Sequence, residues 1–226
     1  MPFTLLIPLV GPLQSWGLDA RFDLRQTAPE PSKSAVIGLL CCCLGRDRGE
    51  PVDDLTGLRF GVRVDEEGIL LRDFHTAVDV IGSSDSKLRT VVSNRWYLAD
   101  AAFLAGFEGP HPLLEQIHQV LIHPHWMPCL GRRSCIPSVP LFAGGIEERP
   151  LLEALEKAPL LKASNRAGSR AGSRANDAKL RMVIEDPDGS QVRPDQPLAS
   201  FSQRQFGHRR VHTYTLSVPL AGGQYP

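Results

Sequence analysis

The run Phe3-Thr4-Leu5-Leu6-Ile7-Pro8-Leu9-Val10 decides the fold class, because large apolar residues alternate with their neighbours along it and predict a β-strand. The block Gly11-Pro12-Leu13-Gln14-Ser15-Trp16-Gly17 follows and predicts a tight loop, since its glycines let the backbone approach a partner closely. Gln14 and Ser15 offer hydrogen-bond donors there, and Trp16 offers a flat face on which an unpaired base could stack. The alternative is a core tryptophan beside a structural turn.

The rest of the chain alternates between helix and strand signals. Pro31-Ser32 predicts the start of a helix that ends at Gly45, and Pro112 predicts the start of a second helix with one apolar face. Strand patterns cover residues 60–64, turning into 69–71, and residues 97–107. The order strand-helix-strand-strand-helix-strand is typical of RNA-recognition modules, so we expect an α+β, ferredoxin-like (RRM-like) domain.

The composition is that of an ordinary globular protein. Its 226 residues are 42% hydrophobic and 22% charged, which suits one elaborated domain or two small ones. No apolar run approaches the roughly 20 residues of a membrane helix, and the start lacks a basic signal region, so we expect a cytoplasmic protein without membrane contact. The five cysteines show no Cys-x-x-Cys spacing and predict reduced thiols, with no disulfide framework, metal site or cofactor.

Two adjacent arginines stand on a glycine-led loop between prolines, in the stretch Pro128-Cys129-Leu130-Gly131-Arg132-Arg133-Ser134-Cys135-Ile136-Pro137. A guanidinium binds two phosphate oxygens at once and is weakly hydrated, so Arg132 and Arg133 suit an anionic ligand, above all a nucleic-acid backbone. The alternative is a surface turn whose arginines pair with carboxylates. The formal net charge of zero counts against a nucleic-acid binder, although basic residues cluster in separate segments.

Two further regions offer phosphate or base contacts. At the first predicted helix start, free N–H groups and the positive dipole end suit a phosphate, and Lys33 beside Ser34 adds a full charge. Residues 78–93 interrupt the strand pattern with a small, polar stretch, which predicts a long excursion out of the sheet. Four residues flank this excursion and are candidates for contacts with phosphates and nucleobases: Arg72, His75, Arg95 and Trp96. The alternative for the Trp-Tyr pair at the start of the next strand is a place in the core.

Six blocks of the sequence occur in the order of a known family. Beside the first loop and the arginine loop, they are Pro31-Ser32-Lys33-Ser34-Ala35-Val36-Ile37-Gly38-Leu39-Leu40, Leu71-Arg72-Asp73-Phe74-His75-Thr76, Arg95-Trp96-Tyr97-Leu98-Ala99-Asp100-Ala101-Ala102-Phe103 and Arg204-Gln205-Phe206. With them the chain resembles the CasD subunit family of the type I-E CRISPR surveillance complex, Cascade. The resemblance implies a subunit that grips the 5′ handle of the guide RNA (crRNA) and caps the backbone filament in antiviral defence. It also implies contacts with the Cascade backbone subunit and large subunit, and contact with target DNA only indirectly through the complex.

In this family the excursion is a thumb that folds across the guide RNA, so we expect a thumb insertion at about residues 73–100. We expect a ferredoxin-like RNA-binding domain over residues 1–145 and a small β-rich C-terminal region over residues 146–226. Within that region, an Arg-Ala-Gly-Ser repeat cannot bury a core and predicts a flexible linker at about residues 163–178. Such a tract could add nonspecific attraction for RNA or DNA.

The expected function is therefore noncatalytic crRNA binding, and the alternative is a metal-independent endoribonuclease that processes CRISPR precursor RNA. Relatives in another CRISPR subtype cut this RNA, and metal-free cleavage needs a base for the 2′-hydroxyl proton and an acid or cation at the phosphorane. Candidate bases are His75, His123, His125, His208 and His212. No grouping of histidine, tyrosine and lysine in the sequence matches such a processing site, and type I-E systems assign cutting to a separate subunit.

Overall fold

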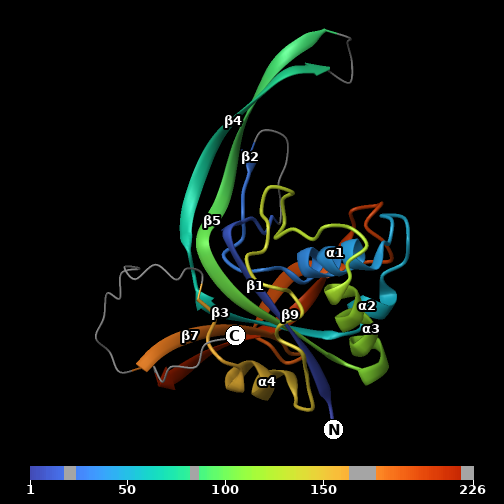
Figure 1. The fold of residues 1–226 in the computed structure, drawn as a ribbon, viewed down its shortest axis with the longest axis vertical. Helices are drawn as coiled ribbons and strands as arrows, with labels where there is room; N and C mark the ends of the chain where they lie inside the picture. Colours follow the sequence, from blue (N-terminus) through green and yellow to red (C-terminus); the bar gives the residue numbers. More distant parts are fainter. Residues whose placement is uncertain (18–23, 82–86, 163–176, 220–226) are drawn as a thin grey trace.

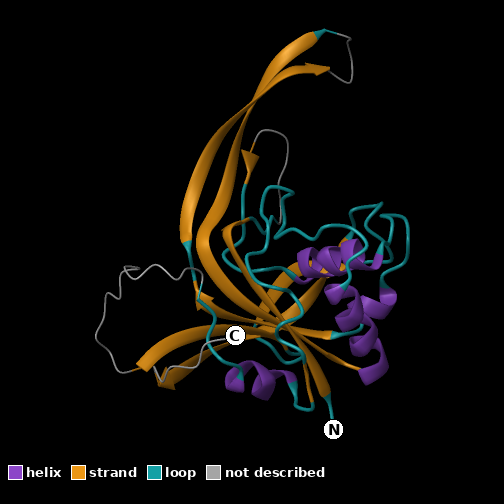
Figure 2. Cartoon of the chain, in the orientation of Figure 1, coloured by secondary structure: helices purple, strands orange, loops and turns teal. Residues whose placement is uncertain are grey.

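The computed structural model describes residues 1–17, 24–81, 87–162 and 177–219. These residues form a mixed α/β fold on one large, mostly antiparallel sheet (Figures 1 and 2). The strands are β1 (Phe3–Gln14), β2 (Leu24–Arg25), β3 (Arg59–Glu66), β4 (Ile69–Ile81), β5 (Leu88–Gly109), β6 (Ile146–Glu147), β7 (Asp177–Glu185), β8 (Gln191–Pro197) and β9 (Phe206–Pro219). The helices are α1 (Lys33–Leu44), α2 (Asp53–Thr56), α3 (His111–Ile122) and α4 (Leu151–Lys157). No described helix is long and apolar enough to cross a membrane.

The strands run in the order β6-β1-β5-β3-β7-β9-β8, while β2 and β4 also pair with β5. Every neighbouring pair along that path is antiparallel. Helix α1 lies in the connection from β1 to β3, and α3 lies in the connection from β5 to β6. The helices and strands expected from the sequence are therefore present in the expected order.

Strand β1 is buried along most of its length because helices cover both faces of the sheet. Leu5, Ile7 and Leu9 belong to one apolar cluster with residues of α1 and α3, whereas Leu6 and Val10 belong to a second cluster with residues of α4. In Figure 1, α1, α2 and α3 lie together on one side and α4 lies below the sheet. Burial on both faces explains why residues 3–10 are almost continuously apolar.

Helix α1 begins and ends where the sequence predicts. Ser32 is its N-cap, and the Ser32 hydroxyl accepts a hydrogen bond from the Ala35 N–H at 3.3 Å. Gly45 ends the helix in the left-handed region at φ 74°, and its N–H donates to the Cys41 and Cys42 carbonyls. Both signals act between close neighbours in sequence, so the sequence alone is enough to place them.

The excursion expected around residues 78–93 is a long β-hairpin that rises away from the rest of the sheet (Figure 1). Strands β4 and β5 pair from Ile69↔Ala99 to Ile81↔Leu88, so the strand predicted over residues 97–107 in fact begins at Leu88. The predicted strand was too short because the outer parts of the two hairpin strands pair only with each other. Neither face of that part is buried against a core, so its sequence lacks a clear apolar alternation. The polar tip at residues 82–86 lies outside the described residues.

The strands that follow residue 145 continue the same sheet. β6 pairs with β1 at Thr4↔Glu147 and Leu5↔Ile146, and β7 pairs with β3 from Gly61↔Ile184 to Val64↔Arg181. Strands β7, β9 and β8 then form a small antiparallel unit at the end of the sheet. The linker predicted at residues 163–178 lies, up to residue 176, outside the described residues.

Candidate nucleic-acid interface

The two loops singled out in the sequence lie directly against each other. The Ser15 N–H donates to the Leu130 carbonyl at 3.1 Å, which fastens the loop after β1 to the arginine loop. Gly131 sits beside this bond at φ 93°, and a Cβ atom there would stand 1.8 Å from the Ser15 carbonyl oxygen. Only glycine permits both that backbone angle and that approach, so Gly131 fixes where Arg132 and Arg133 project.

Arg132 is held by two further contacts. Its guanidinium carbon lies 4.6 Å from the ring centroid of Tyr97 on β5, which places the cation over the aromatic face. Its Nη2 atom donates to the Arg25 carbonyl at 2.8 Å. The other terminal nitrogen, Nη1, is buried and has no hydrogen-bond partner among the described residues.

An open cleft of about 610 Å³ lies in front of these loops, and we call it the arginine cleft. Four separate segments each bring an arginine to it, and its lining is Ser15, Gly17, Arg25, Gln26, Ala35, Arg48, Gly131, Arg132 and Arg204. Arg48 and Arg204 are exposed, and neither forms a hydrogen bond or ion pair with another described residue. Cations without carboxylate partners around an open cleft are suited to polyanion binding.

A second hollow of about 550 Å³ adjoins the first, and we call it the aromatic hollow. It shares Arg48 and Arg204 with the arginine cleft and adds aromatic rings, its lining being Gly38, Cys41, Cys42, Arg46, Asp47, Arg48, Trp126, Arg133, Phe201, Arg204 and Phe206. Trp126 and Phe206 are 44% and 41% exposed, so their rings are accessible. Exposed aromatic faces beside arginines can stack unpaired bases while the guanidiniums bind the backbone.

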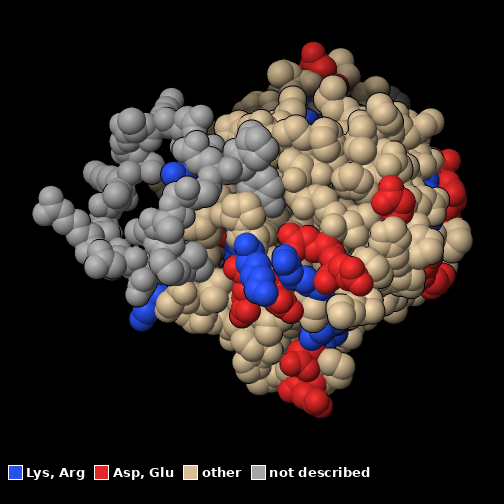
Figure 3. Space-filling view, turned by 60° about the horizontal axis from the view of Figure 1, so that its bottom comes forward, with Lys and Arg blue, Asp and Glu red and all other residues tan. Residues whose placement is uncertain are grey.

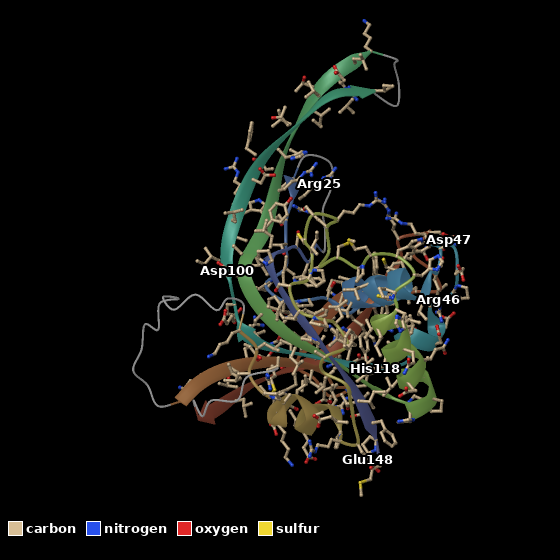
Figure 4. The ribbon with its side chains drawn as sticks, viewed as in Figure 1. Arg25, Arg46, Asp47, Asp100, His118 and Glu148 are labelled. Carbon is tan, nitrogen blue, oxygen red and sulfur yellow. The ribbon has the colours of Figure 1, made fainter. Side chains whose placement is uncertain are left out.

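Several residues of the aromatic hollow have roles set by their neighbours. Arg46 forms a two-pronged ion pair with Asp54, at 2.7 and 2.5 Å, so its charge is largely used within the protein. Burial raises the pKa of Cys41 to about 11, so this thiol stays protonated and acts as an apolar wall. Figure 4 shows Arg25 on β2 beside the hairpin, and Arg46 and Asp47 on the loop after α1. Among the residues that the structure describes, no cluster of three or more histidine, cysteine, aspartate or glutamate side chains could hold a metal ion.

The structure corrects the expected roles of Gln14 and Trp16. Both side chains are fully buried, and the Gln14 amide donates to the Leu9 and Ala101 carbonyls at 3.0 and 2.8 Å. The Trp16 indole N–H donates to the Gln14 side-chain oxygen at 3.1 Å, so its ring is part of the core and has no face free for a base. Ser15 does reach the arginine cleft, although its hydroxyl donates to the Trp96 carbonyl.

Lys33 does not present its charge to a ligand either. Its side chain is 1% exposed, and its ammonium donates to Glu185 at 2.9 Å and to the Thr56 carbonyl at 2.8 Å. Burial lowers the pKa of Lys33, and the Glu185 carboxylate opposes that shift. The Lys33 N–H at the helix start donates to Asp195, while Ser34 lies half-buried with its hydroxyl 3.3 Å from that of Ser32. The Lys33 ammonium and N–H, which the sequence assigned to phosphate, are thus already bonded to groups within the protein.

The remaining four predicted residues lie on the hairpin and outside both openings. Arg72 donates to the Asn94 side chain and lies 6.0 Å from the Trp96 ring centroid. His75 stands 3.6 Å from Asp73, and Arg95 donates to the Ser93 hydroxyl at 3.2 Å. Strand β2 joins the two regions, because Arg25 pairs with Arg95 in the parallel β2–β5 register.

Sequence reasoning missed much of the aromatic hollow and part of the arginine cleft. Arg25, Arg48, Trp126 and Phe201 carried no motif, because turns and loops from distant parts of the chain bring them together. Arg204 and Phe206 did belong to a quoted block, but nothing local indicated that the β8–β9 loop reaches α1. Two observations show where this loop lies: Phe201 packs beside Gly38 of α1, and the Val52 N–H before α2 donates to the Ala199 carbonyl at 2.9 Å.

The opposite side of the molecule has a different charge pattern. Figure 3, which brings the lower side of Figure 1 forward, shows lysines and arginines interleaved with aspartates and glutamates. Around α4, Arg149 pairs with Glu147 at 2.5 Å and Lys157 pairs with Glu153 at 2.5 Å. Cations in such pairs are neutralised locally, so this face is less suited to a polyanion than the arginine cleft.

Comparisons with known proteins agree with one another. The chain is 35% identical over 160 residues to the CRISPR system Cascade subunit CasD of Escherichia coli (strain K12), covering 62% of this chain and 70% of that protein. A crystal structure of a Cas protein superposes with a TM-score of 0.74 at 42% identity and covers 95% of both chains. A chain of a CRISPR RNA-guided surveillance complex superposes with a TM-score of 0.79 at 32% identity, covering 96% of this chain and 91% of that one.

The family model for the CRISPR-associated protein Cas5 matches residues 4–212, which include nearly all of β1, the hairpin, both openings and the first half of β9. The match spans all the segments that contribute arginines to the arginine cleft. On the strength of this match and the CasD relative, the chain belongs to the CRISPR-associated Cas5 family.

Proposed function

We propose that this protein is a noncatalytic, crRNA-binding subunit of a type I-E Cascade complex and that it grips the 5′ handle of the crRNA. The observation that carries the proposal is the pair of adjoining openings that share Arg48 and Arg204. One opening is lined mainly by arginines and polar groups, and the other adds accessible aromatic rings. A single strand with its bases splayed needs both kinds of surface, side by side.

In this arrangement the arginine cleft binds successive phosphates and the aromatic hollow receives a base. Arg132 and Arg133 come from one loop and face different openings, since Arg132 lines the cleft and Arg133 lines the hollow. The arginine pair thus divides its contacts between the two openings. Stacking on Trp126 or Phe206 would contribute about 1–3 kcal/mol per base with little dependence on base identity.

The finer description of the fold is also a proposal. We infer that β6, β1, β5 and β3 with α1 and α3 form a ferredoxin-like unit, because they have the antiparallel 4-1-3-2 strand order and crossover helices of that fold. The unit then runs to β6, just past residue 145. The β4–β5 hairpin corresponds to the proposed thumb, with Arg72, His75, Arg95 and Trp96 placed to meet RNA that leaves the cleft.

Holding RNA rather than cutting it fits the chemistry of the two openings. Arginine stays protonated at physiological pH, so it stabilises phosphate charge but does not remove a proton from a 2′-hydroxyl. The partners included in the proposal are the Cascade backbone subunit and large subunit, with target DNA reached only through the complex. The CasD relative and the surveillance-complex chain support these assignments by their similarity to this chain.

The shared arginines provide the direct test. Changing Arg48 and Arg204 together to alanine removes two exposed cations that have no partner among the described residues, so the fold should be unaffected. Binding of a single-stranded RNA carrying the complete CRISPR repeat should weaken. The slope of log K against log salt should flatten by about 1.4, because each single-strand phosphate contact accounts for about 0.7.

A matched control removes two cations from the opposite side, through Arg149→Ala with Lys157→Ala. Both of these side chains are exposed and paired near α4. The control should leave affinity and slope close to those of the unmodified protein. Equal losses in the two double variants would show that overall charge, and not the shared openings, governs binding.

A further inference from the structure

The contacts around Arg132 contain an arrangement that the loop sequence does not explain. The guanidinium carbon lies over the Tyr97 ring, at 4.6 Å from the ring centroid, and one nitrogen donates to the Arg25 carbonyl. The second terminal nitrogen is buried without a hydrogen-bond partner among the described residues. A buried N–H without an acceptor costs free energy, so the other contacts of the guanidinium must hold it in this orientation.

Tyr97 is buried, with 6% of its surface exposed, and it does not line the arginine cleft. It can therefore affect a ligand in the cleft only through the side chain that covers its ring. The ring face attracts the guanidinium and limits its rotation, so Arg132 loses little side-chain entropy when it binds. Arg132 also starts from a loop fixed by Gly131 and Ser15, so backbone and side chain are both constrained before RNA arrives.

We propose that Tyr97 is a positioning residue for RNA binding: its ring holds the Arg132 guanidinium in the orientation that meets a backbone phosphate in the arginine cleft. This inference rests on the proposed function and adds that part of the affinity depends on a buried ring that touches no RNA. A phenylalanine at position 97 keeps the ring face. A leucine keeps an apolar side chain and removes the ring.

The experiment is a double-mutant cycle on the full chain, with the complete-repeat RNA as probe. Tyr97→Leu should weaken binding about fivefold, within the range of a partly desolvated cation–π contact. Tyr97→Phe should stay within about twofold of the unmodified protein. In an Arg132→Ala background, Tyr97→Leu should cause no further loss, because the group through which the ring acts is gone.

Phe103→Leu is the matched control, because Phe103 is a fully buried aromatic residue on the same strand and makes no cation–π contact within the described part of the chain. It should leave the affinity unchanged. If Tyr97→Leu does not fold, Arg132→Lys gives a second measurement: the ammonium keeps the charge but loses the planar guanidinium that stacks on the ring, so this variant should bind more weakly than the unmodified protein.

The possible outcomes separate this inference from the proposed function. An equal loss from Tyr97→Leu with and without Arg132, or full affinity in Arg132→Lys, would overturn the positioning role while leaving the RNA site in place. Unchanged affinity in Arg132→Ala would overturn both the positioning role and the use of this loop for RNA. A loss that disappears in the Arg132→Ala background supports the inference.

Discussion

Replacing Asp195 by alanine should destabilise the protein by about 3–5 kcal/mol, the usual effect of removing one partner of a buried ion pair. The Asp195 carboxylate is 2% exposed and accepts from Arg209 at 2.7 and 2.9 Å and from the Lys33 N–H at 2.8 Å. Its loss leaves the Arg209 guanidinium charged, 6% exposed and unpaired. Native stability is typically about 5–15 kcal/mol, so the melting temperature should fall by about 10 °C.

The same variant should weaken RNA binding, because Asp195 and Arg209 close the base of the β8–β9 loop. That loop carries Arg204 to both openings and contacts the segment before α2 through Ala199. Urea unfolding measures the stability change, and a repeat-RNA titration well below the midpoint measures the binding change. Asp54→Ala breaks a surface pair with Arg46 and should cost at most about 1 kcal/mol. An Asp195→Ala cost as small as that of Asp54→Ala would refute the reasoning.

Two other expectations can be checked with the purified chain. Repeat-containing precursor RNA should remain intact with EDTA or with magnesium, and a cut at one position that a single His→Ala change abolishes would contradict the noncatalytic assignment. Gly131→Ala should lower both stability and RNA affinity, because the new Cβ would stand 1.8 Å from the Ser15 carbonyl oxygen. Gly145→Ala is its control, since Gly145 has a left-handed φ of 67° but open space around it, so it should cost only about 1–2 kcal/mol. Similar effects from both changes would show that backbone strain, and not the collision, is what matters at position 131.

The sequence predicted the parts of this fold that depend on near neighbours. Ser32 and Gly45 set the ends of α1 through contacts within a few residues, and the apolar run at residues 3–10 identified the buried strand β1. The hairpin was underestimated because its outer strands lack a buried face. The burial of Lys33 and Trp16 could not be predicted from neighbouring residues either. Lys33 pairs with Glu185, 152 residues away in the sequence, and Trp16 packs in a cluster that includes residues of β5.

The sequence indicated the geometry of the candidate site where a loop constrains itself, and it missed residues that come together from distant segments. Gly131 and the arginines beside it form a rigid unit that was visible as a motif. Arg48 and Arg204 are separated by most of the chain, and they meet only because β8 and β9 return to the end of α1. No local pattern in the sequence predicts that β8 and β9 lie near the end of α1.

The zero net charge, which counts against a nucleic-acid binder, is explained by where the charges are neutralised. On the α4 side, cations such as Arg149 and Lys157 are paired with carboxylates at the surface, and in the interior Arg209 is paired with Asp195. At the two openings, Arg48, Arg133 and Arg204 have no carboxylate partner among the described residues. A phosphate responds to nearby, unpaired cations, because salt screens charges beyond about 10 Å. We therefore expect the local excess of unpaired arginines, and not the total charge of the protein, to govern RNA binding at the two openings.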